Sequence, residues 1–176
     1  MRFVIVLLGN KGEVYKDTRH NASRILFETV KEMPHGFDIL TPTGFMNESG
    51  LDVAKYLRYH DEVMPIIVYD DKDLEIGRLM LAYDRGDGGH NGLKSVIQCL
   101  GRTNFLRLRV GIAREGTDGQ TLLPLHGDAV QKFVMGKMTE KEKEILKEKS
   151  KSILPMLHTI YDHGYQKAME VYNKKI

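Results

Sequence analysis

The chain has 176 residues, 41% of them hydrophobic and 28% charged, with a formal net charge of +2. This length suits one domain with a substantial core, and the composition is that of an ordinary globular protein rather than a disordered chain. The small net charge does not by itself indicate a nucleic-acid-binding protein. Cys99 is the only cysteine, so an internal disulfide is excluded.

The chain opens with a continuous apolar run at residues 3–8, which predicts a strand covered on both faces. The run is too short to span a membrane and lacks a small-residue cleavage site, so we expect neither a membrane anchor nor a signal peptide. A turn follows at residues 9–12. Apolar residues at helical spacing then predict a helix over residues 22–33, which Pro34 ends.

Residues 37–40 predict a short second strand. The next helix is expected to begin within residues 47–50, where Ser49 is the better candidate for its cap. Two further strands are predicted at residues 64–69 and 78–83.

A glycine-rich loop at residues 84–92 precedes a helix whose apolar positions are Leu93, Val96, Ile97 and Leu100. Cys99 lies in this apolar run, so we expect a buried, inert thiol. Residues 105–112 alternate between apolar and polar side chains, which predicts a strand with one solvent-facing side.

The last third of the chain is expected to be helical. One long helix begins near Thr139 and runs towards Asp162 with a kink at Pro155, and a final helix covers residues 165–174. Strands that alternate with helices predict a single α/β domain over residues 1–176. We expect a three-layer sandwich with a mixed, mostly parallel sheet, flanking helices and C-terminal helices.

Polar residues follow several of the predicted strands. Asn10, Asp70 and Asn91 each come after a strand or the loop beyond it, and ligands of open α/β sheets bind beyond the carboxyl ends of the strands. His20 and Asn21 add polar groups just before a helix. We therefore expect Asn10, Asp70 and Asn91 to lie in one cleft.

Each residue also has a purely structural interpretation. Asn10 beside glycines is compatible with a turn, and Asp70 is compatible with a solvated strand end. Asn91 and Asn21 are both candidates for helix caps, and a lone histidine such as His20 is usually structural or exposed.

Several catalytic patterns are missing from the chain. Residues 86–92 do not form the GxGxxG phosphate motif, no serine lies in GxSxG, and no HExxH pair is present. A histidine, a carboxylate and several asparagines remain. This set suits water activated by a general base, with amides that hydrogen-bond to a carbonyl group and to the water.

The chain resembles the bacterial peptidyl-tRNA hydrolase family over nearly its whole length and in one order. The resemblance rests on six stretches: Leu8-Gly9-Asn10-Lys11-Gly12 with Tyr15 and Thr18-Arg19-His20-Asn21, Phe45-Met46-Asn47-Glu48-Ser49-Gly50, Tyr69-Asp70-Asp71, Gly88-Gly89-His90-Asn91-Gly92-Leu93-Lys94, Arg107-Leu108-Arg109-Val110-Gly111-Ile112 and Phe133-Val134-Met135-Gly136-Lys137.

The resemblance implies cleavage of the ester between a peptide and the 3′ end of tRNA. His20 would be the base, Asp70 would hold its ring, and Asn10 and Asn91 would position the substrate and the water. The implied substrate-binding residues are Tyr15, Met46, Asn47 and His90, and the implied tRNA-binding residues are Arg109 and Arg85. No metal or cofactor is implied, and we expect a cytoplasmic monomer without membrane contacts.

The sequence departs from the family in several places. Lys11, Leu7 and Ser23 replace a usual proline and two usual glycines. Ala82 lies where the family generally has a lysine that contacts the tRNA 5′-phosphate, so Arg85 is the expected substitute. The segment between His20 and Met46 is also shorter, by about the length of one strand pair.

Two other functions fit the same resemblance. A non-catalytic RNA-binding relative could lose the histidine or its aspartate freely, but this chain has both His20 and Asp70. A small-molecule hydrolase on this scaffold would give the arginines near position 109 no role.

Overall fold

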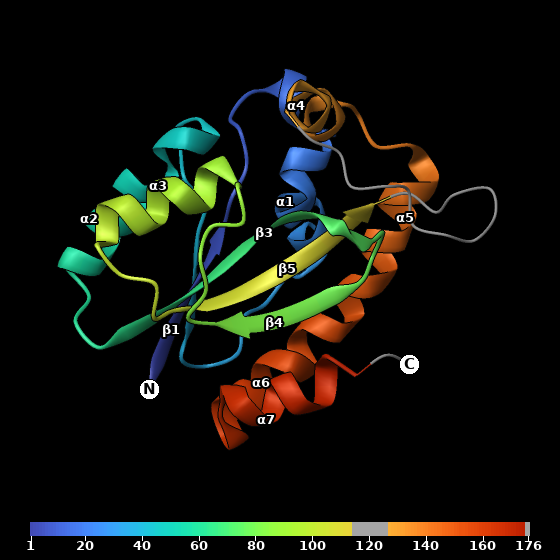
Figure 1. Cartoon of the computed structure of the whole chain (residues 1–176). Coiled ribbons are helices and arrows are strands. Elements are labelled where there is room, and N and C mark those ends of the chain that lie inside the picture. The colour runs from blue at the N-terminus through green and yellow to red at the C-terminus, as the bar shows by residue number, and fades with distance from the viewer. Residues whose placement is uncertain (114–126, 175–176) are drawn as a thin grey trace.

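The computed structural model describes residues 1–113 and 127–174. Its centre is a five-stranded sheet in the order β2-β1-β3-β5-β4 (Figure 1). The strands are β1 (Arg2–Leu7), β2 (Phe37–Leu40), β3 (Val63–Glu75), β4 (Leu79–Tyr83) and β5 (Leu106–Ala113). All neighbouring pairs are parallel except β4 with β5, which is antiparallel. The prediction of a mixed, mostly parallel sheet is confirmed.

Helices cover both faces of the sheet. The helices are α1 (Ala22–Phe27), α2 (Ser49–Arg58), α3 (Asn91–Leu100), α4 (Asp128–Met135), α5 (Glu140–Lys149), α6 (Ile153–His163) and α7 (Tyr165–Tyr172). The helices α2 and α3 lie on one face, and α1, α5 and α6 lie on the other (Figure 1). The structure is therefore the predicted α/β sandwich.

Both faces of β1 are covered, which explains why its sequence is apolar throughout. Val4 and Val6 pack into the core on the side of α2 and α3, whereas Phe3 and Ile5 pack into the core on the side of α1. Because successive side chains of a strand point to opposite faces, both sets must be apolar when both faces are covered.

Two helix predictions are wrong in their boundaries. The first helix ends at Phe27 rather than at residue 33. Val30 and Met33 lie beyond it but still pack against the core, and their spacing in the sequence therefore resembled that of a longer helix. The long C-terminal helix is broken by a 3-10 turn, Ser150–Ser152, and Pro155 lies in the first turn of α6. The break precedes Pro155 because a proline ring clashes with the carbonyl group four residues earlier.

Three local predictions are also wrong. Ser49 is the first residue of α2 and not its cap, because the 3-10 turn Met46–Glu48 precedes it. Cys99 is exposed rather than buried. The strand at residues 105–112 lies inside the sheet, and Arg107 on it is fully buried.

Arg107 is held inside the protein by local contacts, although its buried Nε has no hydrogen-bond partner among the described residues. Its guanidinium lies 4.2 Å from the centre of the Phe105 ring and donates to the carbonyl oxygens of Thr103, Phe105 and Arg85. Arg107 thereby holds the loop that follows β4, and it is not available to bind a phosphate.

The close contact between α2 and α3 yields a test of the fold. The Gly50 N–H donates to Ser95 Oγ at 3.0 Å, and a Cβ atom on Gly50 would overlap the Ser95 carbonyl group. We expect Gly50→Ala to destabilise the protein by about 1–3 kcal/mol in urea unfolding, despite the better helix propensity of alanine. Gly86→Ala, where a Cβ meets no atom within 4 Å, should change stability little. Equal stabilities of the two variants would contradict this packing.

Candidate active site

A cavity of about 1020 Å³ lies beyond the carboxyl end of β1 and alongside residues 69–73 of β3. All ten residues that the sequence predicted for the site line it: Asn10, Tyr15, His20, Met46, Asn47, Asp70, Arg85, His90, Asn91 and Arg109. The prediction that polar residues after different strands share one cleft is therefore correct.

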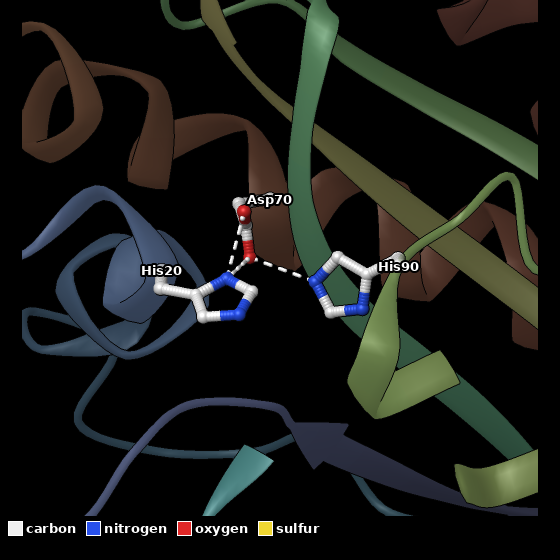
Figure 2. A group of neighbouring side chains, drawn as sticks. All are labelled: His20, Asp70 and His90. Atoms are coloured by element: carbon white, nitrogen blue, oxygen red, sulfur yellow. Dashed lines mark hydrogen bonds and ion pairs between the residues drawn. The ribbon is translucent and has the colours of Figure 1, made fainter. Parts of the chain in front are cut away.

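Asp70 lies at the centre of this group, with 4% of its surface exposed. His20 Nδ1 is 2.9 Å and 3.0 Å from the two carboxylate oxygens, and His90 Nε2 is 2.9 Å from Oδ1 (Figure 2). The interpretation of Asp70 as a solvated strand end is wrong, because β3 continues past it to Glu75. The carboxylate thus accepts hydrogen bonds from two imidazoles.

These contacts determine which ring nitrogens carry protons. An ionised carboxylate can only accept, so His20 Nδ1 and His90 Nε2 are the protonated atoms. His90 Nδ1 accepts from the Leu93 N–H at 3.2 Å and must be unprotonated. His20 Nε2 points away from Asp70 in Figure 2, and it is the atom that carries the lone pair whenever the ring is neutral.

The electrostatics of the site favour an ionised Asp70. Burial by itself raises the pKa of Asp70, but the attraction of the His20 and His90 rings, which carry positive charge when protonated in acid, and their hydrogen bonds more than offset burial. The pKa of Asp70 therefore lies well below its usual range.

The same three side chains are the described residues that could hold a metal ion. One nitrogen of each imidazole and a carboxylate oxygen all lie within 4.8 Å of one another. However, both nitrogens are directed at the carboxylate itself, at 2.9 Å. A metal ion would have to displace these hydrogen bonds, so the arrangement fits a hydrogen-bonded group better than a metal site.

His90 has a different setting from the one expected of a substrate-binding residue. It is the N-cap of α3, and both of its ring nitrogens are used, one by Leu93 and one by Asp70. Asn91 is the first residue of that helix and not its cap, and its side chain is exposed at the cavity.

Asn10 is not a simple turn residue. It is buried, its Oδ1 accepts from the Met46 N–H at 2.8 Å, and its Nδ2 lies 3.7 Å from Met135 Sδ. The side chain of Asn21 pairs with the Asn10 backbone at 2.8 Å and 3.1 Å, and it makes no capping bond to α1. Asn10 therefore connects three segments around the cavity.

The turn that carries His20 is fixed from the C-terminal side. Arg19 donates to both Glu142 oxygens at 2.9 Å and 3.0 Å, and its guanidinium lies 4.7 Å from the centre of the Phe133 ring. Burial raises the pKa of Glu142, but the Thr139 N–H and Arg19 outweigh burial, so the pKa of Glu142 is lowered. This buried pair anchors the residue next to His20.

Arg109 lines the cavity but is already engaged. Its Nε donates to Asp71 Oδ2 at 2.7 Å, and its Nη1 lies 3.2 Å from Met80 Sδ. Arg85 is exposed at the cavity, whereas Ala82 is buried in β4. Of these positions, only Arg85 and Arg109 present a charge to the cavity.

Sequence analysis missed three contributors to the site. The helix α4 lines one wall, and the apolar spacing of Val130 and Val134 was the available signal. Asp71 was quoted as part of a motif without a role, and no pattern in the sequence pointed to Arg24, which contacts the Asn10 backbone.

Comparisons with known proteins agree with this geometry. The model of the family described as Peptidyl-tRNA hydrolase matches residues 28–176. A peptidyl-tRNA hydrolase from Pelobacter propionicus is 34% identical over 194 aligned positions, which cover 98% of this chain and 95% of the relative. A relative of the same name from Trichlorobacter lovleyi is 35% identical, with 98% and 95% covered. These alignments are longer than the chain itself, so the relatives have residues without a counterpart here.

Solved structures give the same result. The crystal structure of peptidyl-tRNA hydrolase from Acinetobacter baumannii superposes with a TM-score of 0.80 at 26% identity, covering 96% of this chain and 93% of that one. The chain belongs to the peptidyl-tRNA hydrolase family. The sequence-based assignment to this family is confirmed.

The lowered pKa of Asp70 predicts how stability depends on pH. Its ionised form stabilises the folded protein above the unfolded-state pKa of about 3.9, and this stabilisation is lost as the pH falls towards the lower folded-state value. Between about pH 5 and pH 2, wild type should therefore lose more free energy of unfolding than Asp70→Asn does. Denaturant titrations at several pH values test this, with the exposed Asp73→Asn as a control that follows wild type. Parallel curves for wild type and Asp70→Asn would refute the assignment.

Proposed function

We propose that this protein hydrolyses the ester bond between a peptide, or an N-blocked amino acid, and the 3′ end of tRNA. The observation that best supports the proposal is the His20 ring, which Asp70 holds through Nδ1 at 2.9 Å within a cavity of about 1020 Å³. Membership of the peptidyl-tRNA hydrolase family supports the choice of substrate.

In the proposed reaction, His20 Nε2 accepts a proton from a water molecule while the water oxygen bonds to the ester carbonyl carbon. The buried Asp70 carboxylate stabilises the imidazolium that forms. The tetrahedral intermediate then collapses, the bond from the carbonyl carbon to the ribose oxygen breaks, and His20 returns the proton to that oxygen. The products are a peptide carboxylic acid, which ionises in water, and tRNA with a free hydroxyl group.

Amide side chains are proposed to orient the substrate and the water. Among the residues that the structure describes, the Met135 sulfur is the one partner of Asn10 Nδ2 and a weak one, so this amide can donate to a carbonyl oxygen of the substrate. Asn47 and Asn91 are exposed at the cavity and can bind the peptide backbone and the tRNA terminus. Tyr15 and the buried Met46 complete the wall on this side.

His90 is proposed to act mainly through Asp70. Since both of its ring nitrogens are engaged, it meets substrate only through its carbon atoms. Its hydrogen bond fixes the carboxylate that holds His20, which makes His90 a positioning residue.

Arg109 and Arg85 are proposed to meet tRNA phosphates. The ion pair with Asp71 offsets part of the Arg109 charge, so its contribution should be smaller than that of an unpaired arginine. The biological role that we propose is the recycling of peptidyl-tRNA released from ribosomes, by a monomer in the cytoplasm. Among the described residues, no helix is long and apolar enough to cross a membrane.

The alternative is a non-catalytic RNA-binding relative. A protein that only binds RNA does not require a histidine held by a buried carboxylate. The hydrogen bond between His20 and Asp70 therefore favours the enzyme over the binding protein. A small-molecule hydrolase would leave Arg85 and Arg109 at the cavity without a use.

The role of His20 is tested by single-turnover cleavage of an N-blocked aminoacyl-tRNA. We expect His20→Ala to remain folded and to lose on the order of 10²–10⁴-fold in rate, because the substitution removes the proposed general base. The exposed His158→Ala should cleave as fast as wild type. A strong chelator should leave the wild-type rate unchanged, because the proposed steps use only side chains and water. A normal rate for His20→Ala would exclude this mechanism.

The role of Arg109 is tested by salt dependence. We expect Arg109→Ala to raise KM for full-length peptidyl-tRNA, most clearly at low salt, with little change in kcat. The slope of log affinity against log salt concentration should fall by no more than roughly 0.7–0.9, the value for one phosphate contact. A short peptidyl-oligonucleotide should hardly be affected. Equal losses on both substrates would show that Arg109 has a structural role instead.

A further inference from the structure

Arg24 joins two segments that lead to the cavity. From α1, its Nη1 donates to the Asn10 carbonyl oxygen at 3.0 Å, and its Nη2 donates to the Gly9 and Pro42 carbonyl oxygens at 2.8 Å and 2.9 Å. Gly9 and Asn10 follow β1, whereas Pro42 lies between β2 and the 3-10 turn that begins at Met46. One guanidinium therefore holds two loops together.

The same two loops meet again at the cavity. The Met46 N–H donates to Asn10 Oδ1 at 2.8 Å, and Asn47 follows directly. This contact forms only if the Asn10 backbone and the Pro42 segment are at the right separation. Arg24 and Asn21 together satisfy the Asn10 backbone, whose N–H and carbonyl groups are both hydrogen-bonded.

Gly9 gives independent support for this arrangement. A Cβ atom at Gly9 would lie 2.6 Å from Arg24 Nε and 2.8 Å from Asn21 Oδ1. The guanidinium thus approaches the backbone so closely that a side chain cannot fit at this position.

Arg24 does not itself line the main cavity, although it borders a smaller hollow beside it. We propose that Arg24 is a positioning residue that sets the location of the Asn10 amide and, through the Asn10 Oδ1 contact with Met46, that of the Met46–Asn47 segment for the substrate. This inference rests on the proposed hydrolysis, in which Asn10 and Asn47 bind the substrate.

The chemistry of arginine suits this task. Its planar fork of N–H donors can reach three carbonyl oxygens at once, which the single ammonium group of lysine cannot do with the same geometry. Burial lowers the pKa of Arg24, yet a guanidinium stays protonated at neutral pH. Its Nη1 and Nη2 atoms reach three carbonyl oxygens, whereas its buried Nε has no hydrogen-bond partner among the described residues.

A double-mutant cycle tests the proposal with Arg24→Met, Asn10→Ala and the double variant, in single-turnover cleavage of an N-blocked aminoacyl-tRNA. Misplaced binding groups typically cost up to about 10²-fold, so we expect Arg24→Met to lower the rate by roughly 10- to 100-fold. In the Asn10→Ala background, the same change should cost less than about twofold, because Arg24 acts through Asn10. Arg24→Lys should fall between wild type and Arg24→Met.

Arg78→Met is the matched control. Arg78 is also half-buried and donates to a backbone carbonyl oxygen, that of Asn173 at 3.4 Å, but it does not line the cavity. The variant Arg78→Met should leave the single-turnover cleavage rate unchanged. Additive losses in the cycle, or a folded Arg24→Met with the wild-type rate, would overturn the proposal. If Arg24→Met does not fold, the cycle is run with Arg24→Lys and the same criteria.

A second readout separates this inference from the proposed function. The backbone and side-chain amide resonances of Asn10 in a ¹⁵N NMR spectrum should shift in Arg24→Met and stay unchanged in Arg78→Met. If wild type cleaves no peptidyl-tRNA while the Asn10 signals shift, the proposed function fails and the positioning of Asn10 by Arg24 stands. Unchanged Asn10 signals in Arg24→Met would overturn the positioning role whatever the activity.

Discussion

The buried Asp70 carboxylate, held between two imidazoles, is the interaction on which the rest of the site depends. An ionised carboxylate with 4% exposure is stable only if donors replace its lost water, and His20 and His90 supply them. The same bonds fix the proton positions of both rings. His20 is thereby left with its lone pair directed away from Asp70, as a general base requires.

The fold brings these groups together from distant parts of the chain. The carboxylate comes from a central strand, His90 caps α3 on one face of the sheet, and His20 precedes α1 on the other face (Figure 1). Arg19 and Arg24 hold the neighbouring segments, one through Glu142 and the other through backbone carbonyl groups. One buried and one half-buried arginine therefore support a site whose proposed chemistry uses a histidine and amides.

Order along the chain was enough to predict an α/β sheet and a cleft that contains Asn10, Asp70 and Asn91. The other predicted residues of the cavity were implied only by the resemblance to the family. Contacts that depend on side-chain geometry could not be predicted. Nothing in the sequence shows that Asp71 pairs with Arg109, or that Arg107 is buried rather than solvent-facing. The extension of β3 past Asp70 could not be predicted either, because two consecutive aspartates in the sequence are typical of a strand end.

The proton positions on the two histidines are the most direct test of this account. ¹⁵N chemical shifts of the imidazole nitrogens, measured near pH 8 on uniformly labelled protein, distinguish protonated from unprotonated ring nitrogens. We predict the Nδ1–H tautomer for His20 and the Nε2–H tautomer for His90, as the contacts with Asp70 and Leu93 require. A His20 ring protonated at Nε2 instead would contradict the account, because the nitrogen proposed to accept the proton of water would already carry one.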